Sequence, residues 1–422
     1  MKRVLIILLL LMLSAFSLYA QEGTDETIPE PVPLIDEGEY NIINFLLMGS
    51  DTTDSRYVGR TDVMMIVSVN RTVGTVSMLS IPRDLYVYIP GYRVYRINTA
   101  YPHGESIEAE GGGVGLLKET IEYNLGIHID YHAQVDFVEF RQIIDDLGGV
   151  EASVDCALSD WRLIEPTLDP NLEESWEMFT LPVGVHDMNG DLALWFARSR
   201  RTTSDFDRGR RQQVIMRALW GRIRSLSLFD QLADVWSQVI EMVDTDISLD
   251  DMLSFVPLAA SIDTDRIASY TFRPNIEVNF FTSPEGSSVL MPNRDAVQSL
   301  MNHVMQPVTQ HQLVREGSRV DIINGSGTGE LSRVAADRLA WEGFVPTISQ
   351  ETASYQSGTV IYDYTGSTKG SSLGTLQAAL RVDPANIVLE PNSDREVDFR
   401  VVLGGAYNSC TYQATSALEE GD

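Results

Sequence analysis

The chain has 422 residues, 44% of them hydrophobic and 22% charged, a composition that is ordinary for soluble globular domains with proper cores. Its formal net charge of −29 excludes a general nucleic-acid binder, because the phosphate backbone would repel such a surface. Lysine occurs only at Lys2, Lys118 and Lys369, so nearly every cation is an arginine. Because the planar guanidinium group matches phosphate oxygens, arginines that cluster in an acidic chain predict an anion site.

The first 20 residues predict an export signal. Met1-Lys2-Arg3 precedes the uncharged apolar run Val4–Leu18, which is the pattern of a signal sequence. With Tyr19 and Ala20 included, the apolar run only just reaches the lower limit for a spanning helix, and Leu18 is larger than the residue that a cleavage site prefers there. The segment is therefore either a cleaved signal or a membrane anchor. Both alternatives place the rest of the chain outside the cytoplasmic membrane, in the cell envelope.

A spacer and a first domain follow. Residues 21–40 carry three prolines among acidic residues, which predicts an extended, solvated spacer. Apolar helical spacing predicts a helix over 114–125 that ends at Gly126, and another that ends at Leu147-Gly148-Gly149. Strands alternate with these helices, so we expect an α/β domain with a mixed sheet flanked by helices over residues 41–309. The predicted strands are 42–48, 63–69, 76–81, 85–89, 133–137 and 150–154.

The second half of the chain predicts more helix and then a separate unit. Residues 189–224 have the pattern of two helices joined by a polar elbow at 202–205. Further helix, with strands near 267–271 and 289–291, completes the first domain. A smaller α/β domain is expected over 319–406, with a strand at 320–323 and a helix through Trp341, and residues 407–422 form a tail.

The only cysteines are Cys156 and Cys410. Export permits a disulfide between them. Two unpaired small core residues remain an equal alternative, because the bond would join two different predicted domains.

Three charged clusters lie at the predicted ends of strands and helices. Paired carboxylates and several arginines at the ends of α/β strands suit a Mg²⁺-assisted reaction at a pyrophosphate. The carboxylates would bind the metal, and the arginines would neutralise charge on the leaving phosphate. The clusters are Gly49-Ser50-Asp51 with Gly59-Arg60-Thr61-Asp62, Ile81-Pro82-Arg83-Asp84, and the Arg198–Gln213 segment.

A simpler interpretation competes with this one at each position. Arginines on a helix usually form a solvated face, and we expect this of Arg210, Arg217, Arg222 and Arg224. A single Asp–Arg pair is often a turn salt bridge that contributes little. The joint occurrence of the clusters favours the functional interpretation.

The first domain resembles the LytR-CpsA-Psr (LCP) family of cell-wall glycopolymer transferases, over roughly Asn41–Met305. The motifs stand in the family's order. They are Asn44-Phe45-Leu46-Leu47-Met48-Gly49-Ser50-Asp51, Gly59-Arg60-Thr61-Asp62, Ser80-Ile81-Pro82-Arg83-Asp84, Arg96-Ile97-Asn98-Thr99-Ala100-Tyr101, Asp146-Leu147-Gly148-Gly149-Val150 and the Arg198–Gln213 segment.

The resemblance implies a long apolar pocket for a polyprenyl tail, with walls from 114–125, 137–147 and 214–226. It also implies that Asp51 and Asp62 bind Mg²⁺. Catalytic roles fall on Arg83, Arg198, Arg200 and Asp205, the last as the better candidate for a base than Asp207. Substrate-binding roles fall on Arg60, Arg96, Arg208 and Gln212. Arg96 departs from the family, which often has lysine at this position.

The second domain resembles the C-terminal LytR domain through Val320-Asp321-Ile322-Ile323-Asn324-Gly325-Ser326-Gly327 and Gly343-Phe344. A dinucleotide-binding turn at Gly325, Gly327 and Gly329 is the weaker alternative, because the third glycine misses the required spacing.

Together these features predict a phosphotransferase. An acceptor hydroxyl on peptidoglycan would attack the sugar-linked phosphate of a polyprenyl-pyrophosphate glycopolymer, and polyprenyl phosphate would leave. The cytoplasmic membrane and peptidoglycan are the expected partners, and nucleic acid is not. Two alternatives stay open: a protein that binds polyprenyl pyrophosphates without turnover, and a hydrolase that uses water as the acceptor.

Overall fold

The computed structural model describes residues 28–50, 61–165, 167–228, 232–262, 266–307, 317–366, 371–408 and 410. All elements named below belong to one compact unit, Val32–Asp422. The expected signal or anchor at residues 1–20 lies outside the described residues, as do Asp51 and Arg60. Within the described ranges, no helix combines the length and the apolar character that crossing a membrane requires.

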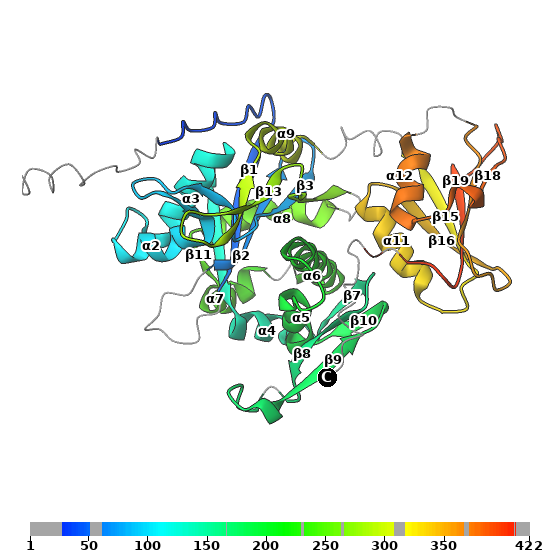
Figure 1. Ribbon diagram of the computed structural model, residues 1–422, viewed down its shortest axis with the longest axis horizontal. Helices are drawn as coiled ribbons and strands as arrows, with labels where there is room; N and C mark the ends of the chain where they lie inside the picture. Colours follow the sequence, from blue (N-terminus) through cyan, green and yellow to red (C-terminus); the bar gives the residue numbers. More distant parts are fainter. Residues whose placement is uncertain are drawn as a thin grey trace, which may run out of the picture. The chain divides into compact units, whose positions relative to one another are not determined.

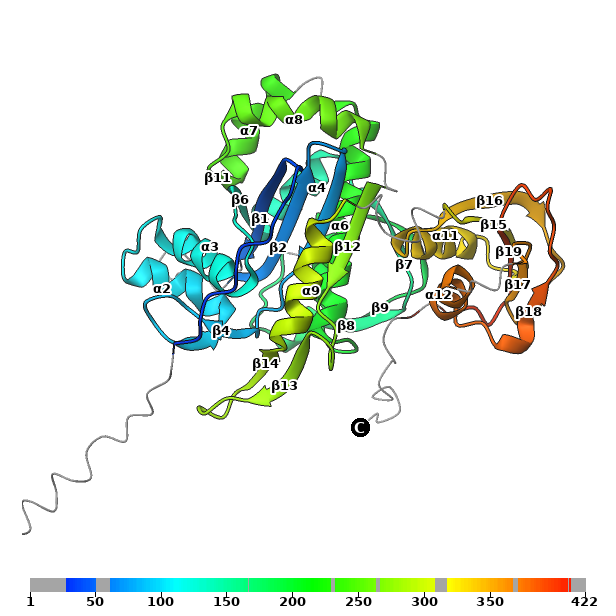
Figure 2. The same ribbon diagram turned by 90° about the horizontal axis from the view of Figure 1, so that it is seen from above.

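A mixed six-stranded sheet forms the centre of the first domain (Figures 1 and 2), in the order β11-β6-β1-β2-β3-β12. Every neighbouring pair is antiparallel except β1 with β6 and β3 with β12, which are parallel. The strands are β1 (Ile42–Ser50), β2 (Thr61–Asn70), β3 (Thr75–Ser80), β6 (Tyr131–Asp136), β11 (Asp244–Thr245) and β12 (Ile267–Thr271).

The strand directions bring several chain segments to one edge of this sheet. Since β1, β3, β6 and β12 all run the same way, their carboxyl ends lie at the same edge. The amino end of the antiparallel β2 joins them, because Ser50 pairs with Thr61. The end of β1, the start of β2 and the charged cluster after β3 are therefore brought together by topology, at an edge where α/β sheets commonly place ligands.

Helices cover both faces of the sheet because the strands alternate apolar side chains between them. Even-numbered residues of β1 and β2, such as Leu46, Met64 and Ile66, pack with α3 (Gly112–Leu125) and α9 (Arg294–Met305). Residues of the opposite parity, such as Met65, pack with α6 (Asp205–Ser225) and α8 (Leu249–Ser261). Gly126 ends α3 in the left-handed conformation with φ 71°, as its sequence position predicts.

The remaining elements of this domain are smaller hairpins and helices. Strand pairs are β4 (Tyr86–Tyr88) with β5 (Val94–Arg96), β7 (Val150–Val154) with β10 (Gly184–Met188), β8 (Leu158–Leu163) with β9 (Trp176–Leu181), and β13 (Val278–Thr282) with β14 (Ser288–Pro292). Helices are α2 (Ala100–Ser106), α4 (Phe137–Asp146), α5 (Gly190–Arg198) and α7 (Leu232–Met242).

The second domain has its own apolar core, made by strands and two helices. Its sheet has five strands in the order β16-β15-β19-β17-β18. The elements are β15 (Arg319–Asn324), α11 (Leu331–Trp341), β16 (Val345–Thr352), β17 (Val360–Asp363), α12 (Ser371–Leu380), β18 (Ile387–Leu389) and β19 (Phe399–Leu403).

One expectation about the spacer is wrong in its second half. The backbone N–H of Val32 donates to the carbonyl of Tyr123 at 2.8 Å, and that of Ile35 donates to Gly126 at 2.9 Å. The side chains of Ile35 and Tyr40 pack against the main core. This stretch is docked rather than solvated, because its isolated apolar residues find a surface that sequence periodicity does not reveal.

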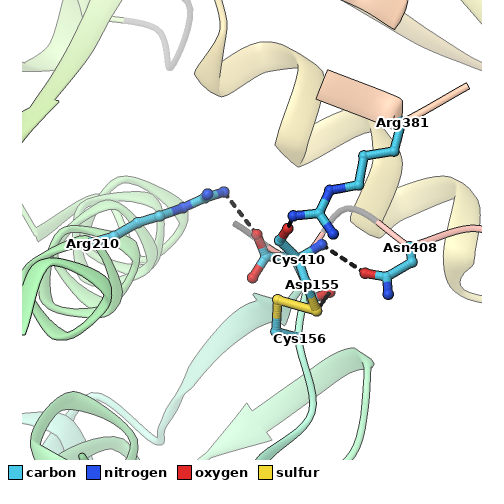
Figure 3. The surroundings of a disulfide bond; sticks show 6 residues. All are labelled: Asp155, Cys156, Arg210, Arg381, Asn408 and Cys410. Carbon is cyan, nitrogen blue, oxygen red and sulfur yellow. Dashed lines mark hydrogen bonds and ion pairs between the residues drawn. A yellow bond between two sulfur atoms is a disulfide. The ribbon is translucent and has the colours of Figure 1, made fainter. Parts of the chain in front are cut away.

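The two cysteines form a disulfide (Figure 3), which resolves the alternative that the sequence left open. Cys156 lies between β7 and β8, and Cys410 follows the second domain. The adjacent Asp155 forms an ion pair of 2.8 Å with Arg210 of α6. The second domain is thus joined covalently to the hairpin region of the first.

Reduction of this bond should therefore lower the stability of the chain. The cross-link spans a sequence separation of 254 residues, and loop entropy gives an upper estimate of about 5 kcal/mol for so long a loop. Thermal melts with and without dithiothreitol measure the change, and Cys156→Ser should melt like the reduced protein in both conditions. Non-reducing peptide mapping that finds two free thiols in the untreated protein would contradict the pairing.

Candidate functional site

The candidate site lies where β2, β3 and α6 meet at the carboxyl edge of the sheet. Asp62 is the second residue of β2, and Arg83 follows β3 directly after Ile81-Pro82. Asp205 opens α6, and Arg208 is one turn further along the same helix. Residues more than a hundred positions apart in the sequence therefore meet at one place.

The start of α6 is fixed by a capping box. The Ser204 hydroxyl accepts the backbone N–H of Asp207, and the Asp207 carboxylate accepts the backbone N–H of Ser204 at 3.0 Å. Asp207 is thus tied into the start of the helix. The cap sets the direction in which the neighbouring Asp205 points, and a carboxylate there is favoured by the helix dipole.

Arg83 is held by three carboxylates. Its Nη1 donates to Asp62 at 2.9 Å, and its Nε lies 3.4 Å from Asp205 and 3.5 Å from Asp84. Burial alone would lower the pKa of Arg83, but the hydrogen bond to Asp62 and the charges of Asp205, Asp62 and Asp84 outweigh it and raise that pKa. The cation is firmly charged and its direction is set.

Two further arginines share the carboxylate of Asp205. Arg208 approaches it at 3.2 Å and Arg200 at 3.5 Å. Arg208 is buried, and this burial lowers its pKa. The positive charges of Arg83 and Arg200 lower this pKa further, whereas the negative charge of Asp205 raises it. The three guanidinium groups of Arg83, Arg200 and Arg208 thus meet at one carboxylate.

The other predicted residues lie around this centre at different distances. Arg96 joins it through Asp84, at 3.1 Å. Gln212 lines the small cavity beside Arg83, and its side chain donates to the carbonyl of Ala197 at 3.3 Å. The guanidinium carbon of Arg198 lies 4.0 Å from the ring centre of Phe137. Phe137 follows β6, so Arg198 is still at the same edge of the sheet.

Contacts that the sequence analysis missed hold α6 against the sheet. A Cβ on Gly209 would lie 3.0 Å from the Cβ of Ser80, which is tighter than an ordinary van der Waals contact, so a larger residue would require α6 or β3 to shift. Gln213 is fully buried and donates to the Ser80 hydroxyl and to the carbonyl of Tyr270, both at 2.8 Å. Their neighbour Arg211 donates to the carbonyl of Phe196 at 2.8 Å. These contacts fix the position of α6 relative to β3 and β12.

The interpretation of the other α6 arginines as a solvated face is wrong for two of them. Burial lowers the pKa of both Arg210 and Arg217. The guanidinium carbons of Arg210 and Arg217 lie 4.9 and 5.6 Å from the ring centre of Trp341. A helix position cannot reveal burial by a partner that comes from another domain.

The cavity beside Arg83 is small and has a mixed lining. It measures about 20 Å³, and its lining includes the charged side chains of Asp62, Arg83, Asp205 and Arg208 and the rings of Phe206 and Phe272. A space of this size holds a water molecule. It does not by itself hold the isoprenoid chain for which the resemblance implies a pocket.

The residues present are compatible with Mg²⁺, although they do not form a complete cage. No group of three or more acidic, histidine or cysteine side chains suited to a metal occurs among the described residues. Mg²⁺ commonly needs only one or two carboxylates and completes its shell with water and substrate phosphates. Ser50 and Thr61, which immediately precede Asp51 and Asp62, pair with each other. Asp62 therefore follows a residue that is paired with the last residue of β1, whereas Asp51 lies outside the described residues.

Comparisons with known proteins agree with this architecture. A model described as the LytR_cpsA_psr family matches residues 17–306, and one described as LytR cell envelope-related transcriptional attenuator matches residues 317–407. The crystal structure of TagV from Bacillus subtilis superposes with a TM-score of 0.51 at 24% identity, covering 63% of this chain and 96% of that chain. This likeness shows the fold.

Two of the proteins that are similar in sequence are called polyisoprenyl-teichoic acid–peptidoglycan teichoic acid transferases. TagT of Bacillus subtilis (strain 168) is 28% identical over 239 residues, 54% of this chain and 68% of TagT. TagU of Oceanobacillus iheyensis is 32% identical over 216 residues, 51% of this chain and 62% of TagU. The matched region thus spans about two thirds of each relative.

Gly209→Ala should destabilise the protein and displace the start of α6. The added methyl group would press on Ser80, and overpacking of this kind costs about 1–3 kcal/mol. Urea unfolding measures the loss. Gly221→Ala is the matched control on the same helix, since nothing lies within 4 Å of its added Cβ. It should be neutral or stabilising by up to about 1 kcal/mol. Equal effects of the two substitutions would contradict the close approach of α6 to β3.

Proposed function

The chain belongs to the LytR-CpsA-Psr family, and on this premise we propose that it transfers a glycopolymer from a polyprenyl-pyrophosphate carrier to peptidoglycan in the cell envelope. The activity for which TagT and TagU are named supports the class of reaction. The observation that carries the proposal for this chain is the convergence of Arg83, Arg200 and Arg208 on Asp205.

The proposed reaction exchanges the phosphoanhydride bond of the donor pyrophosphate for a new phosphate ester bond. An acceptor hydroxyl attacks the phosphorus next to the sugar and loses its proton. The bond from that phosphorus to the bridging oxygen of the pyrophosphate breaks, and polyprenyl phosphate leaves with the electron pair. A phosphodiester then joins the glycopolymer to peptidoglycan. Negative charge grows on the leaving phosphate, so the chief requirement is a set of oriented positive groups.

The converging arginines meet that requirement. Gathering like charges in a cleft is costly unless an anion or nearby carboxylates offset the repulsion. Asp62, Asp84 and Asp205 provide this offset in the free protein. A bound pyrophosphate would accept from the same guanidinium groups, which are already oriented. We assign Arg83, Arg200 and Arg208 to the pyrophosphate, with Asp205 as their organiser and the candidate base.

We also propose roles for the remaining charged and polar residues around this centre. Arg96 and Gln212 would bind the outer part of the donor, and Arg60 and Arg198 would complete the cationic edge. Asp51 and Asp62 would hold Mg²⁺, whose charge would neutralise phosphate oxygens when it is bound. The polyprenyl tail would need an apolar pocket that opens beside this edge.

Arg200→Lys should separate catalysis from passive binding. Lysine keeps the charge but loses the planar fork, so binding of a polyprenyl-pyrophosphate lipid should stay within about tenfold, roughly 1.4 kcal/mol. The transfer rate should fall by about a hundredfold or more, the effect of losing one oriented donor. Arg201→Lys, in the next exposed position of the same loop, serves as the control and should leave both quantities unchanged. A passive binder would lose affinity and show no transfer, and a hydrolase would release the sugar phosphate without an acceptor.

The metal assignment is tested by comparing two carboxylates that both contact Arg83. Asp62→Asn and Asp84→Asn each remove one negative carboxylate charge that contacts that arginine. Only Asp62→Asn should weaken Mg²⁺ binding measured by titration calorimetry, and only its transfer activity should be partly restored by excess Mg²⁺. Full activity of the unmodified protein in EDTA would contradict the metal proposal.

A further inference from the structure

Arg200 lies in the elbow between α5 and α6, which from here on means residues 199–204. This elbow belongs to no helix or strand. Its side chain is 46% exposed, and its ion pair with Asp205 is 3.5 Å long. The direction of this guanidinium therefore depends on how the elbow itself is held.

The elbow is held from the inside by α6. Arg211 donates from Nη1 to the hydroxyl of Thr203 at 3.1 Å and from Nη2 to the carbonyl of Ser199. These contacts fix the two ends of the elbow. They do not engage the backbone N–H groups of Arg200 and Arg201, which lie between them.

Those two N–H groups are engaged from the other side by Asp160 of β8. One carboxylate oxygen of Asp160 accepts from the N–H of Arg200 at 2.8 Å and from the N–H of Arg201 at 3.2 Å. The other oxygen accepts from the N–H of Trp161 at 2.8 Å, which fixes the carboxylate itself. Hydrogen bonds to an ionised acceptor are the stronger kind.

The hairpin that carries Asp160 is itself braced against α5. Asp160 pairs across the strands with Phe179, whose ring packs edge-on against Trp195 of α5 at 5.1 Å between centres. The Trp195 indole N–H donates to the carbonyl of Trp161 at 3.0 Å. Asp160 is thus a fixed point from which the elbow can be oriented.

We infer that Asp160 is a positioning residue for the transfer reaction: it fixes the backbone of Arg200 so that the guanidinium faces Asp205 and the donor phosphate. A role of Asp160 in transfer rests on the proposed function, but the anchoring of the Arg200 backbone rests on the hydrogen bonds alone. The hydrogen bonds of the Asp160 carboxylate go to backbone N–H groups of the elbow and of its own strand. Its effect on the site must therefore pass through Arg200.

The test compares Asp160→Ala, Asp160→Asn and a control, Asp169→Ala. Asp169 also accepts backbone and side-chain hydrogen bonds, but within its own turn and from Asn171. Asp160→Ala should lower kcat by about tenfold or more with little change in KM, because misplacing a catalytic group by about 1 Å can cost about a hundredfold. Asp160→Asn keeps one acceptor oxygen and should recover most of the rate. Amide exchange at 199–203 should rise in Asp160→Ala only.

A double-mutant comparison decides whether the effect passes through Arg200. In an Arg200→Ala background, Asp160→Ala should add no further loss, because the group that it orients is gone. If the unmodified protein shows no transfer, the proposed function fails. The unmodified protein, Asp160→Ala, Arg200→Ala and the double variant are then compared in their affinity for polyprenyl pyrophosphate. There too the two losses should not add. Additive losses in either readout, or an Asp160→Ala protein with unchanged rate and affinity, would overturn the inference.

Discussion

One carboxylate, that of Asp205, is shared by the guanidinium groups of Arg83, Arg200 and Arg208. Including Arg96, Asp62 and Asp84, the described centre holds four arginines and three aspartates. A surplus of positive charge is therefore kept at one edge of a chain whose net charge is −29. The aspartates offset most of the repulsion between the arginines but leave a net positive charge. The site is therefore already oriented to bind an anion before a ligand is present.

The geometry of this centre follows from the direction of the strands and from the docking of α6. Parallel alignment of β1, β3, β6 and β12 puts the ends of four strands at one edge. The close contact of Gly209 with Ser80 then brings the first turn of α6 onto that edge. An elbow anchored by Arg211 from within and by Asp160 from outside adds Arg200. Each arginine reaches Asp205 from a different element.

Much of this could be predicted from the sequence, and the failures have physical causes. Periodicity predicted the principal strands and the two helices around the elbow correctly, because their buried faces are continuous in sequence. Burial of Arg210 and Arg217 was missed because Trp341 belongs to a distant part of the chain. The docking of residues 32–40 was missed because isolated apolar residues carry no period. Asp160 gave no signal because its role depends on a contact with two backbone N–H groups far along the chain.

The central claim is that these arginines serve a transfer reaction, and one assay addresses it directly. The purified protein would be incubated with a polyprenyl-pyrophosphate sugar, Mg²⁺ and peptidoglycan fragments, and the fragments analysed by mass spectrometry. The account predicts a sugar joined to the fragment through a phosphodiester, with polyprenyl phosphate released in equal amount. Free sugar phosphate with unmodified fragments, or donor that remains intact while bound to the protein, would contradict it.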